Sequence, residues 1–179
     1  MEKMKFKHIR SVCLYFIAIP FFLFFLVVNA AIGFDDADLQ RLKLTNQCPG
    51  CNLTGVVLQG AIFPNAKLAG ANISSASISN SKLANTDFSG ANLSYINLNS
   101  ADLTGANMSN ADLRVAILIS AKLEKANLSK ANLAGAALWD ANLTGANLDG
   151  ANLAGAFLGG AIWVDGGKCN ESSKGECKK

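Results

Sequence analysis

The sequence predicts an all-β solenoid, a four-sided tube wound from short extended segments. Two observations lead to this prediction. A large apolar residue returns at every fifth position from Leu53 to Trp163, 23 times without a break. A small or slim residue, usually alanine, stands two positions before each of them. A period of five matches neither an α-helix nor a β-strand, so the chain must turn a corner after every five residues.

Four such sides make one coil of about 20 residues, and successive coils then stack at about 4.8 Å, the spacing of paired strands. The apolar residue fills the middle of the tube, and the small residue before it also points inward. The residues between and after them point outward, and glycine or asparagine suits the corners. The repeats cover residues 51–165. They correspond to almost six coils, or a rod roughly 28 Å long.

The repeated triplet is alanine, then asparagine or aspartate, then leucine. It occurs in this form at 91–93, 101–103 and 141–143. This pattern resembles the pentapeptide-repeat family, over about two thirds of the chain. The resemblance implies a right-handed quadrilateral β-helix. It does not supply a function, because function depends on sites and not on the fold.

The first 33 residues have the features of an export signal. Four basic residues precede an apolar run over residues 12–31. Small residues allow cleavage after Ala30 or after Gly33. The run approaches the ~20 residues that a spanning helix needs, so an uncleaved membrane anchor is the alternative. Because the basic flank stays in the cytoplasm, the rest of the chain is translocated in both cases.

A cap is predicted at each end of the solenoid, because an open end exposes apolar core and unpaired backbone. Residues 34–50 form the N-terminal cap, with a short helix over 34–45 that begins with acidic residues. Residues 166–179 form a polar C-terminal tail with two cysteines.

Four cysteines follow the leader. A disulfide requires Cα atoms within about 7 Å, so pairs at opposite ends of a rod cannot join. The prediction is therefore Cys48–Cys51 and Cys169–Cys177, formed in an oxidising compartment. Similar end-capping pairs occur in exported proteins that resemble this one. For Cys48 and Cys51, a redox pair or half of a zinc site is the alternative; zinc needs two more ligands, and the only histidine is His8 in the leader.

The composition favours no catalytic chemistry. Without a histidine beyond the leader, Ser/His and Cys/His catalysis are excluded. The carboxylates are scattered over different sides, and neither a cofactor nor a metal is expected. Residues 52–164 carry six basic and six acidic residues. This neutral body argues against nucleic-acid binding, which needs clustered Lys and Arg, and equally against an acidic surface that mimics DNA.

Residues 20 apart are expected to stack in columns. One column runs from Asn52 through Asn92 to Asn152 and is expected to form an amide ladder. Another alternates in charge through Lys82, Asp102 and Lys122. Each contact of this kind contributes a few tenths of a kcal/mol, up to ~1. These columns are assigned a structural role only.

One side departs from the polar rule for outward positions. Its large apolar residues form a candidate interaction patch for self-association or for a protein partner. The alternatives are that scattered apolar residues have no role, or that a terminal segment folds over them. The predicted patch consists of Tyr95, Val115, Ile117, Ile119, Trp139 and Phe157.

The function predicted from these features is a non-catalytic exported scaffold that binds a protein partner or itself. The periplasm is the expected compartment, with an inner-membrane-anchored form facing the periplasm, or a thylakoid lumen, as alternatives. One alternative function is a DNA mimic that protects topoisomerases, which some pentapeptide-repeat proteins are; the export signal and the neutral body disfavour it. The other is an envelope redox or stress protein that uses Cys48 and Cys51.

Overall fold

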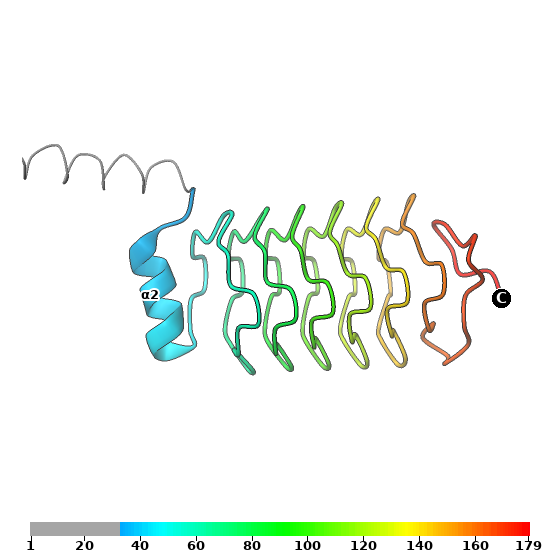
Figure 1. Ribbon diagram of the computed structural model, residues 1–179, viewed down its shortest axis with the longest axis horizontal. Helices are drawn as coiled ribbons and strands as arrows, with labels where there is room; N and C mark the ends of the chain where they lie inside the picture. Colours follow the sequence, from blue (N-terminus) through cyan, green and yellow to red (C-terminus); the bar gives the residue numbers. More distant parts are fainter. Residues whose placement is uncertain (1–32) are drawn as a thin grey trace, which may run out of the picture.

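The computed structural model describes residues 33–179 and shows a rod of stacked coils with a helix at one end (Figure 1). The predicted leader, with its apolar run and both cleavage sites, falls at or before residue 33 and lies almost wholly outside the described residues. Within 33–179, no helix has the length and apolar character needed to cross a membrane.

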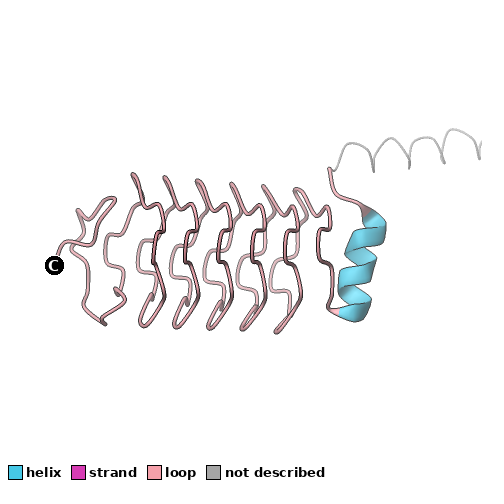
Figure 2. Ribbon diagram, turned by 180° about the vertical axis from the view of Figure 1, so that it is seen from behind, coloured by secondary structure: helices cyan, strands magenta, loops and turns pink. Residues whose placement is uncertain are grey.

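The coil repeats every twenty residues. Parallel β-bridges join each outward residue to the one twenty positions later, from the pair Gln47–Lys67 to the pair Asn142–Ile162. Backbone hydrogen bonds of 2.7–3.1 Å connect the coils. In the described chain the extended segments are single bridges and not longer strands, so Figure 2 draws the whole repeat region as loop. The predicted period and register are therefore present.

The interior follows the five-residue pattern. In the middle of the rod, both the large apolar residue and the small residue before it are fully buried, as Phe88 and Leu133 illustrate. Near the ends, four interior residues that lack cover on one side are only partly buried: Leu58 and Phe63 at the N-terminal end, and Leu148 and Leu153 at the C-terminal end. Burial therefore depends on a neighbouring coil or a cap.

The corners use left-handed backbone. Between residues 55 and 160, the residue two positions after each interior apolar residue has a positive φ. Glycine, asparagine and serine occupy most of these corners, and they tolerate this conformation best. Tyr95 (φ 59°) and Val115 (φ 57°) are the apolar exceptions. A β-branched residue such as Val115 is rarely found there, because its side chain crowds the backbone.

Helix α2 (Asp36–Thr45) lies across the N-terminal end of the rod (Figure 1). Asp35 caps its first turn by accepting a backbone hydrogen bond of 2.8 Å. Asn46 ends the helix in left-handed geometry and donates its backbone N–H to the carbonyl of Leu42. Leu39 and Leu42 are buried against the first coil. The helix thus covers apolar core, as a cap must.

The C-terminal tail covers part of the opposite end. It turns back after the last repeat and forms antiparallel bridges between Phe157 and Lys174 and between Ile162 and Lys168. Residues 33–179 thus contain a continuous core with a cap at each end. We therefore expect this region to fold without residues 1–32.

The amide ladder forms on a different side from the predicted one. In the predicted column, Asn152 donates to Asn132, but the other members do not bond to one another. Their side-chain oxygens instead accept hydroxyl hydrogen bonds, as when Ser94 donates to Asn92 at 2.7 Å. The ladder runs on the neighbouring side, where Asn127 donates to Asn107 and Asn107 donates to Asp87. Serines follow at the same spacing in both columns: Ser109 and Ser129 donate their backbone N–H groups to the ladder asparagines, whereas Ser94 also donates its hydroxyl to Asn92.

Candidate functional site: an apolar side of the rod

The predicted patch lies along one side of the rod. Bridges place Ile117, Ala137 and Phe157 in one column, and Ile119 lies one coil before Trp139. Four of the predicted residues are strongly exposed for large apolar side chains: Tyr95 (63%), Val115 (47%), Ile117 (38%) and Trp139 (37%). We call these four residues the apolar side.

The C-terminal tail covers the end of the predicted patch. Phe157 is half-buried, because Trp139 stacks on it at 4.7 Å between ring centroids and the Lys174 ammonium lies 4.9 Å from its ring centroid. Ile119 is also half-buried. The predicted alternative, that a terminal segment folds over the patch, therefore applies to Phe157, which the C-terminal tail covers. The stack fixes one face of the Trp139 ring, and the side chain as a whole remains 37% exposed.

Two residues of the apolar side occupy strained corners. Tyr95 and Val115 have the left-handed backbone that other corners assign to small or polar residues. A non-glycine residue in a sparsely populated backbone region is destabilising by about 1–3 kcal/mol. The sequence prediction did not use the corner position of Val115, although a β-branched residue at a corner indicates backbone strain. Strain of this kind is retained most often at functional sites.

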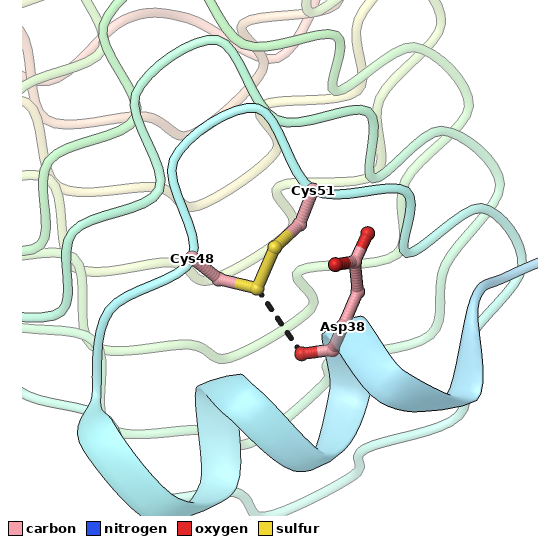
Figure 3. A group of neighbouring side chains, drawn as sticks. All are labelled: Asp38, Cys48 and Cys51. Carbon is pink, nitrogen blue, oxygen red and sulfur yellow. Dashed lines mark hydrogen bonds between the residues drawn. A yellow bond between two sulfur atoms is a disulfide. The ribbon is translucent and has the colours of Figure 1, made fainter.

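A second cluster lies between α2 and the first coil (Figure 3). Cys48 and Cys51 form a disulfide with a Cα–Cα distance of 5.4 Å, and both residues are buried. The Cys48 sulfur lies 3.1 Å from the backbone carbonyl oxygen of Asp38. Arg41 places one guanidinium nitrogen 2.8 Å from both the Cys51 sulfur and the Asp38 carboxylate. The sequence prediction did not include Asp38 and Arg41, which only the docking of α2 brings to this place.

The same cluster contains three possible metal ligands, since atoms of Asp38, Cys48 and Cys51 lie within 4.8 Å of one another. Both sulfurs are already bonded to each other, so neither is a thiolate. The Asp38 carboxylate pairs with Arg41 and accepts the backbone N–H of Asn52 at 2.8 Å. A bound cation would have to displace Arg41. The arrangement thus serves to attach the helix to the first coil.

The second predicted pair, Cys169 and Cys177, forms a disulfide within the tail, with a Cα–Cα distance of 5.1 Å. Cys169 is buried, whereas Cys177 is partly exposed. This bridge closes the tail into a loop over the last coil. Both cysteine pairs thus lie in caps.

The carboxylates of the repeat region are spread over the surface, and those of Asp87, Asp102, Asp112 and Glu124 pair with their local neighbours. A hydrogen bond from Thr104, together with Lys122 and Lys82 in the same column, holds the pKa of Asp102 below its usual range. A hydrogen bond from Arg114 lowers the pKa of Asp112 in the same way. Carboxylates with lowered pKa values are ionised at neutral pH and are poor general acids.

The chain was compared with known proteins. The model of the pentapeptide repeats family matches residues 51–90, 81–118, 96–133 and 126–162, as eight copies. No curated protein matches. Among solved structures, the chain is similar to the pentapeptide repeat protein Rfr23 from the cyanobacterium Cyanothece 51142, with 36% identity, 70% of this chain and 92% of that chain covered, and a TM-score of 0.33.

It is also similar to HetL, a pentapeptide repeat protein involved in heterocyst differentiation regulation from the cyanobacterium Nostoc sp. strain PCC 7120. The identity is 35%, the coverage is 68% of this chain and 63% of that chain, and the TM-score is 0.29. QnrB1, a plasmid-mediated fluoroquinolone resistance protein, shares 22% identity over 64% of this chain and 69% of that chain, with a TM-score of 0.48. The family match spans most of the rod, and the chain therefore belongs to the pentapeptide-repeat family.

Proposed function

We propose that this protein is a non-catalytic scaffold of the cell envelope that is exported and binds a protein partner, or a second copy of itself, through the apolar side. The observation that carries the proposal is a set of four exposed apolar residues, two of them in strained corners. A contiguous exposed apolar surface on a soluble domain marks an interaction site in many proteins. The corner strain favours the same conclusion, since the fold itself does not require Tyr95 or Val115.

The apolar side has the properties of a binding surface. Trp139 and Tyr95 supply large aromatic area, and aromatic residues dominate the energy of many interfaces. Trp139 is supported from beneath by Phe157 and the tail, so little freedom is lost when a partner binds. Neighbouring outward positions include the short residues Ala137 and Ser120. The charged neighbour Arg114 is paired with Asp112 at 2.6 Å.

The proposed lack of catalysis and the proposed export rest on separate features. Solenoids with short corners present surfaces and not enclosed clefts. The repeat region carries no histidine, and the carboxylates of Asp102 and Asp112 are paired locally. The leader of residues 1–33 has the features of an export signal, and the two disulfide pairs suit an oxidising compartment.

The test is affinity capture from envelope extract with the folded protein as bait. The double variant Trp139→Ser and Ile117→Ser is compared with the wild type and with Leu44→Ser, which removes an exposed apolar residue at the N-terminal end. The molar mass in solution is measured for all three. We expect the double variant alone to lose its partner or its self-association. Equal capture and equal mass for all three proteins would contradict the proposal.

A further inference from the structure

The N-terminal end of the rod carries the most exposed large apolar side chains of the described residues. They are Leu44 (82% exposed), Val57 (69%) and Ile62 (64%). Leu44 lies in the last turn of α2, and the end of that helix contacts the side of Ile62, because Asn46 donates to the carbonyl of Pro64 at 2.8 Å. We call Leu44, Val57 and Ile62 the N-terminal rim.

The open end of a solenoid does not by itself explain this exposure. The column of Val57 ends at Phe157, and the column of Ile62 ends at Ile162. At the C-terminal end, the tail pairs with both of these columns and reduces the exposure of Ile162 to 36%. The tail thus covers these two columns at the C-terminal end, whereas their first residues, Val57 and Ile62, are exposed at the N-terminal end.

The backbone shows the same difference. At the N-terminal end, the first coil is closed at Asn52, whose N–H donates to Asp38 and whose carbonyl accepts from Asp35. The N–H and C=O groups of Val57 and Ile62 have no hydrogen-bond partner within residues 33–179. Helix α2 therefore closes only part of this end, and the backbone groups of Val57 and Ile62 are left to water or to a binding partner.

The chain that precedes the rod enters at this end. Gly33 is held against the first coil, where its carbonyl accepts a hydrogen bond from the Asn52 side chain at 2.9 Å. The apolar run of residues 12–31 stops only two residues earlier. Its 20 residues approach the length of ~20 that a spanning helix needs. An anchor made of this run would hold the bilayer directly beside the N-terminal rim.

The charges around the rim fit a lipid surface. Lys43 belongs to the last turn of α2, Lys82 follows Ile62 in its column, and Lys67 stands on the adjoining side. All three lysines are exposed, and Lys67 and Lys82 each neighbour an aspartate of the next coil, while the acidic residues of α2 lie in its first turn at the far end of the helix from Leu44. Apolar side chains bordered by lysines are typical of surfaces that bind the interface of a membrane with anionic lipids.

We propose that residues 12–31 stay attached as a membrane anchor and that the N-terminal rim rests on the bilayer interface. This inference depends on the export that the proposed function includes, but not on the apolar side. The rim lies at the level of the headgroups, because the free backbone groups of Val57 and Ile62 need water that the hydrocarbon core lacks. The apolar side then runs away from the membrane, along the rod.

Tethering makes a small contact sufficient. A covalent anchor raises the effective concentration of the bilayer at the rim to the millimolar range or above. Three aliphatic side chains therefore need only a modest affinity to hold the rod upright on the surface. Without the anchor, the region 33–179 is expected to bind vesicles weakly, and the triple variant Leu44→Ser, Val57→Ser and Ile62→Ser to bind roughly tenfold more weakly still.

The test uses the full chain in vesicles of phosphatidylethanolamine and phosphatidylglycerol whose acyl chains are brominated. Both native tryptophans, Trp139 and Trp163, are replaced by phenylalanine, and a single tryptophan is introduced as Val57→Trp or Ile62→Trp. Tyr95→Trp is the matched control, because Tyr95 is as exposed as Ile62 but lies on the apolar side. We expect several-fold stronger quenching for the two rim variants than for the control.

Equal quenching at the rim and at position 95 would overturn the proposal. So would fluorescence at the rim that is shielded equally with and without lipid, since that result would show a protein neighbour in place of the bilayer. The mass of the chain isolated from cells gives a second criterion, because a chain that begins at Ala31 or Phe34 has lost its anchor. The triple variant should still bind its partner through Trp139, so this proposal and the proposed function can fail separately.

Discussion

The two ends of the rod close the same fold in different ways. At the N-terminal end, a helix packs Leu39 and Leu42 onto the core, and a buried disulfide closes the first turn of the rod beneath it. At the C-terminal end, a tail continues the coil's own hydrogen bonding in antiparallel pairs, and a partly exposed disulfide closes that tail. The helix covers apolar core but leaves the backbone groups of two sides of the first coil without hydrogen bonds. The tail covers and hydrogen-bonds the two sides that contain Phe157 and Ile162.

This difference shows that core burial and edge pairing are separate requirements of a solenoid end. Leu53, in the first coil, is buried although Val57 and Ile62 beside it are bare. Phe157 and Ile162, in the same columns, are paired although Leu148 and Leu153 nearby are only half-buried. Leu58 and Phe63 in the first coil are also only half-buried, so the sides that α2 does not cover are open both in core burial and in backbone pairing, and an open edge is a place where another molecule can bind.

The largest effect is expected from the helical cap. The variant Leu42→Ala removes a side chain that is 2% exposed and is predicted to destabilise the rod by about 2–5 kcal/mol. Leu44→Ala, two residues further along the same helix, is expected to have almost no effect, because Leu44 is 82% exposed. Denaturant unfolding of residues 33–179 compares the two. Similar midpoints would mean that α2 does not cap the core.

The disulfides are expected to have the next largest effect. Chain-entropy estimates for sequence separations of 8 and 3 give about 2.5 kcal/mol for Cys169–Cys177 and about 1.6 kcal/mol for Cys48–Cys51. Paired serine variants and denaturant midpoints measure both. With increasing reductant, the partly exposed Cys177 bridge should open first, which alkylation and mass spectrometry detect. Earlier reduction of Cys48–Cys51 would support the redox alternative for that pair.

A smaller effect is expected from two isoleucines of one column. Ile162→Ser disturbs a paired and partly covered position and is predicted to destabilise the protein by about 1–2 kcal/mol. Ile62→Ser removes a 64% exposed side chain at the bare end, so its effect should stay within about 0.5 kcal/mol. Thermal unfolding of the two single variants in the absence of lipid provides the comparison. Equal losses would show that the N-terminal rim is packed in solution.

The smallest effect concerns the pH dependence of the C-terminal tail. Hydrogen bonds from Lys179 and from the backbone of Gly167 hold the pKa of Asp165 below its usual range. A lowered pKa adds stability that is present above the ordinary value near pH 4 and is lost as the pH falls through the folded-state value. The protection of the Gly167 amide, taken as the ratio of its intrinsic to its observed exchange rate, should therefore fall at acidic pH. In Asp165→Asn, this acid-dependent change should be absent.

The regular part of the fold was accessible from the sequence, because one period determines both what lies inside and what stacks. The 20-residue register, the burial of Phe88 and Leu133, and the pairing of Cys169 with Cys177 all follow from counting. The count also places Ile117, Ala137 and Phe157 in one column. These features need no knowledge of how irregular segments pack.

The contacts that the five-residue period does not predict depend on how the irregular segments pack and on how individual side chains are oriented. The contact of Arg41 with Cys51 requires the docking of α2, which has no period. The cover of Phe157 by Lys174 requires the path of the tail. The position of the amide ladder depends on side-chain orientation, because serines follow Asn107 and Asn127 at the same spacing at which Ser94 follows Asn92. In each case a side chain has several possible partners nearby, and only the three-dimensional structure shows which partner it contacts.

Amide hydrogen exchange of residues 33–179 in water, with both disulfides intact, tests the difference between the two ends most directly. The account predicts that the amides of Val57 and Ile62 exchange as fast as unpaired groups. The amide of Leu158, which donates to Ser173 at 3.0 Å, and that of Cys169, which donates to Ala161 at 2.8 Å, should be protected. Protection of Val57 and Ile62 equal to that of Leu158 and Cys169 would contradict the account.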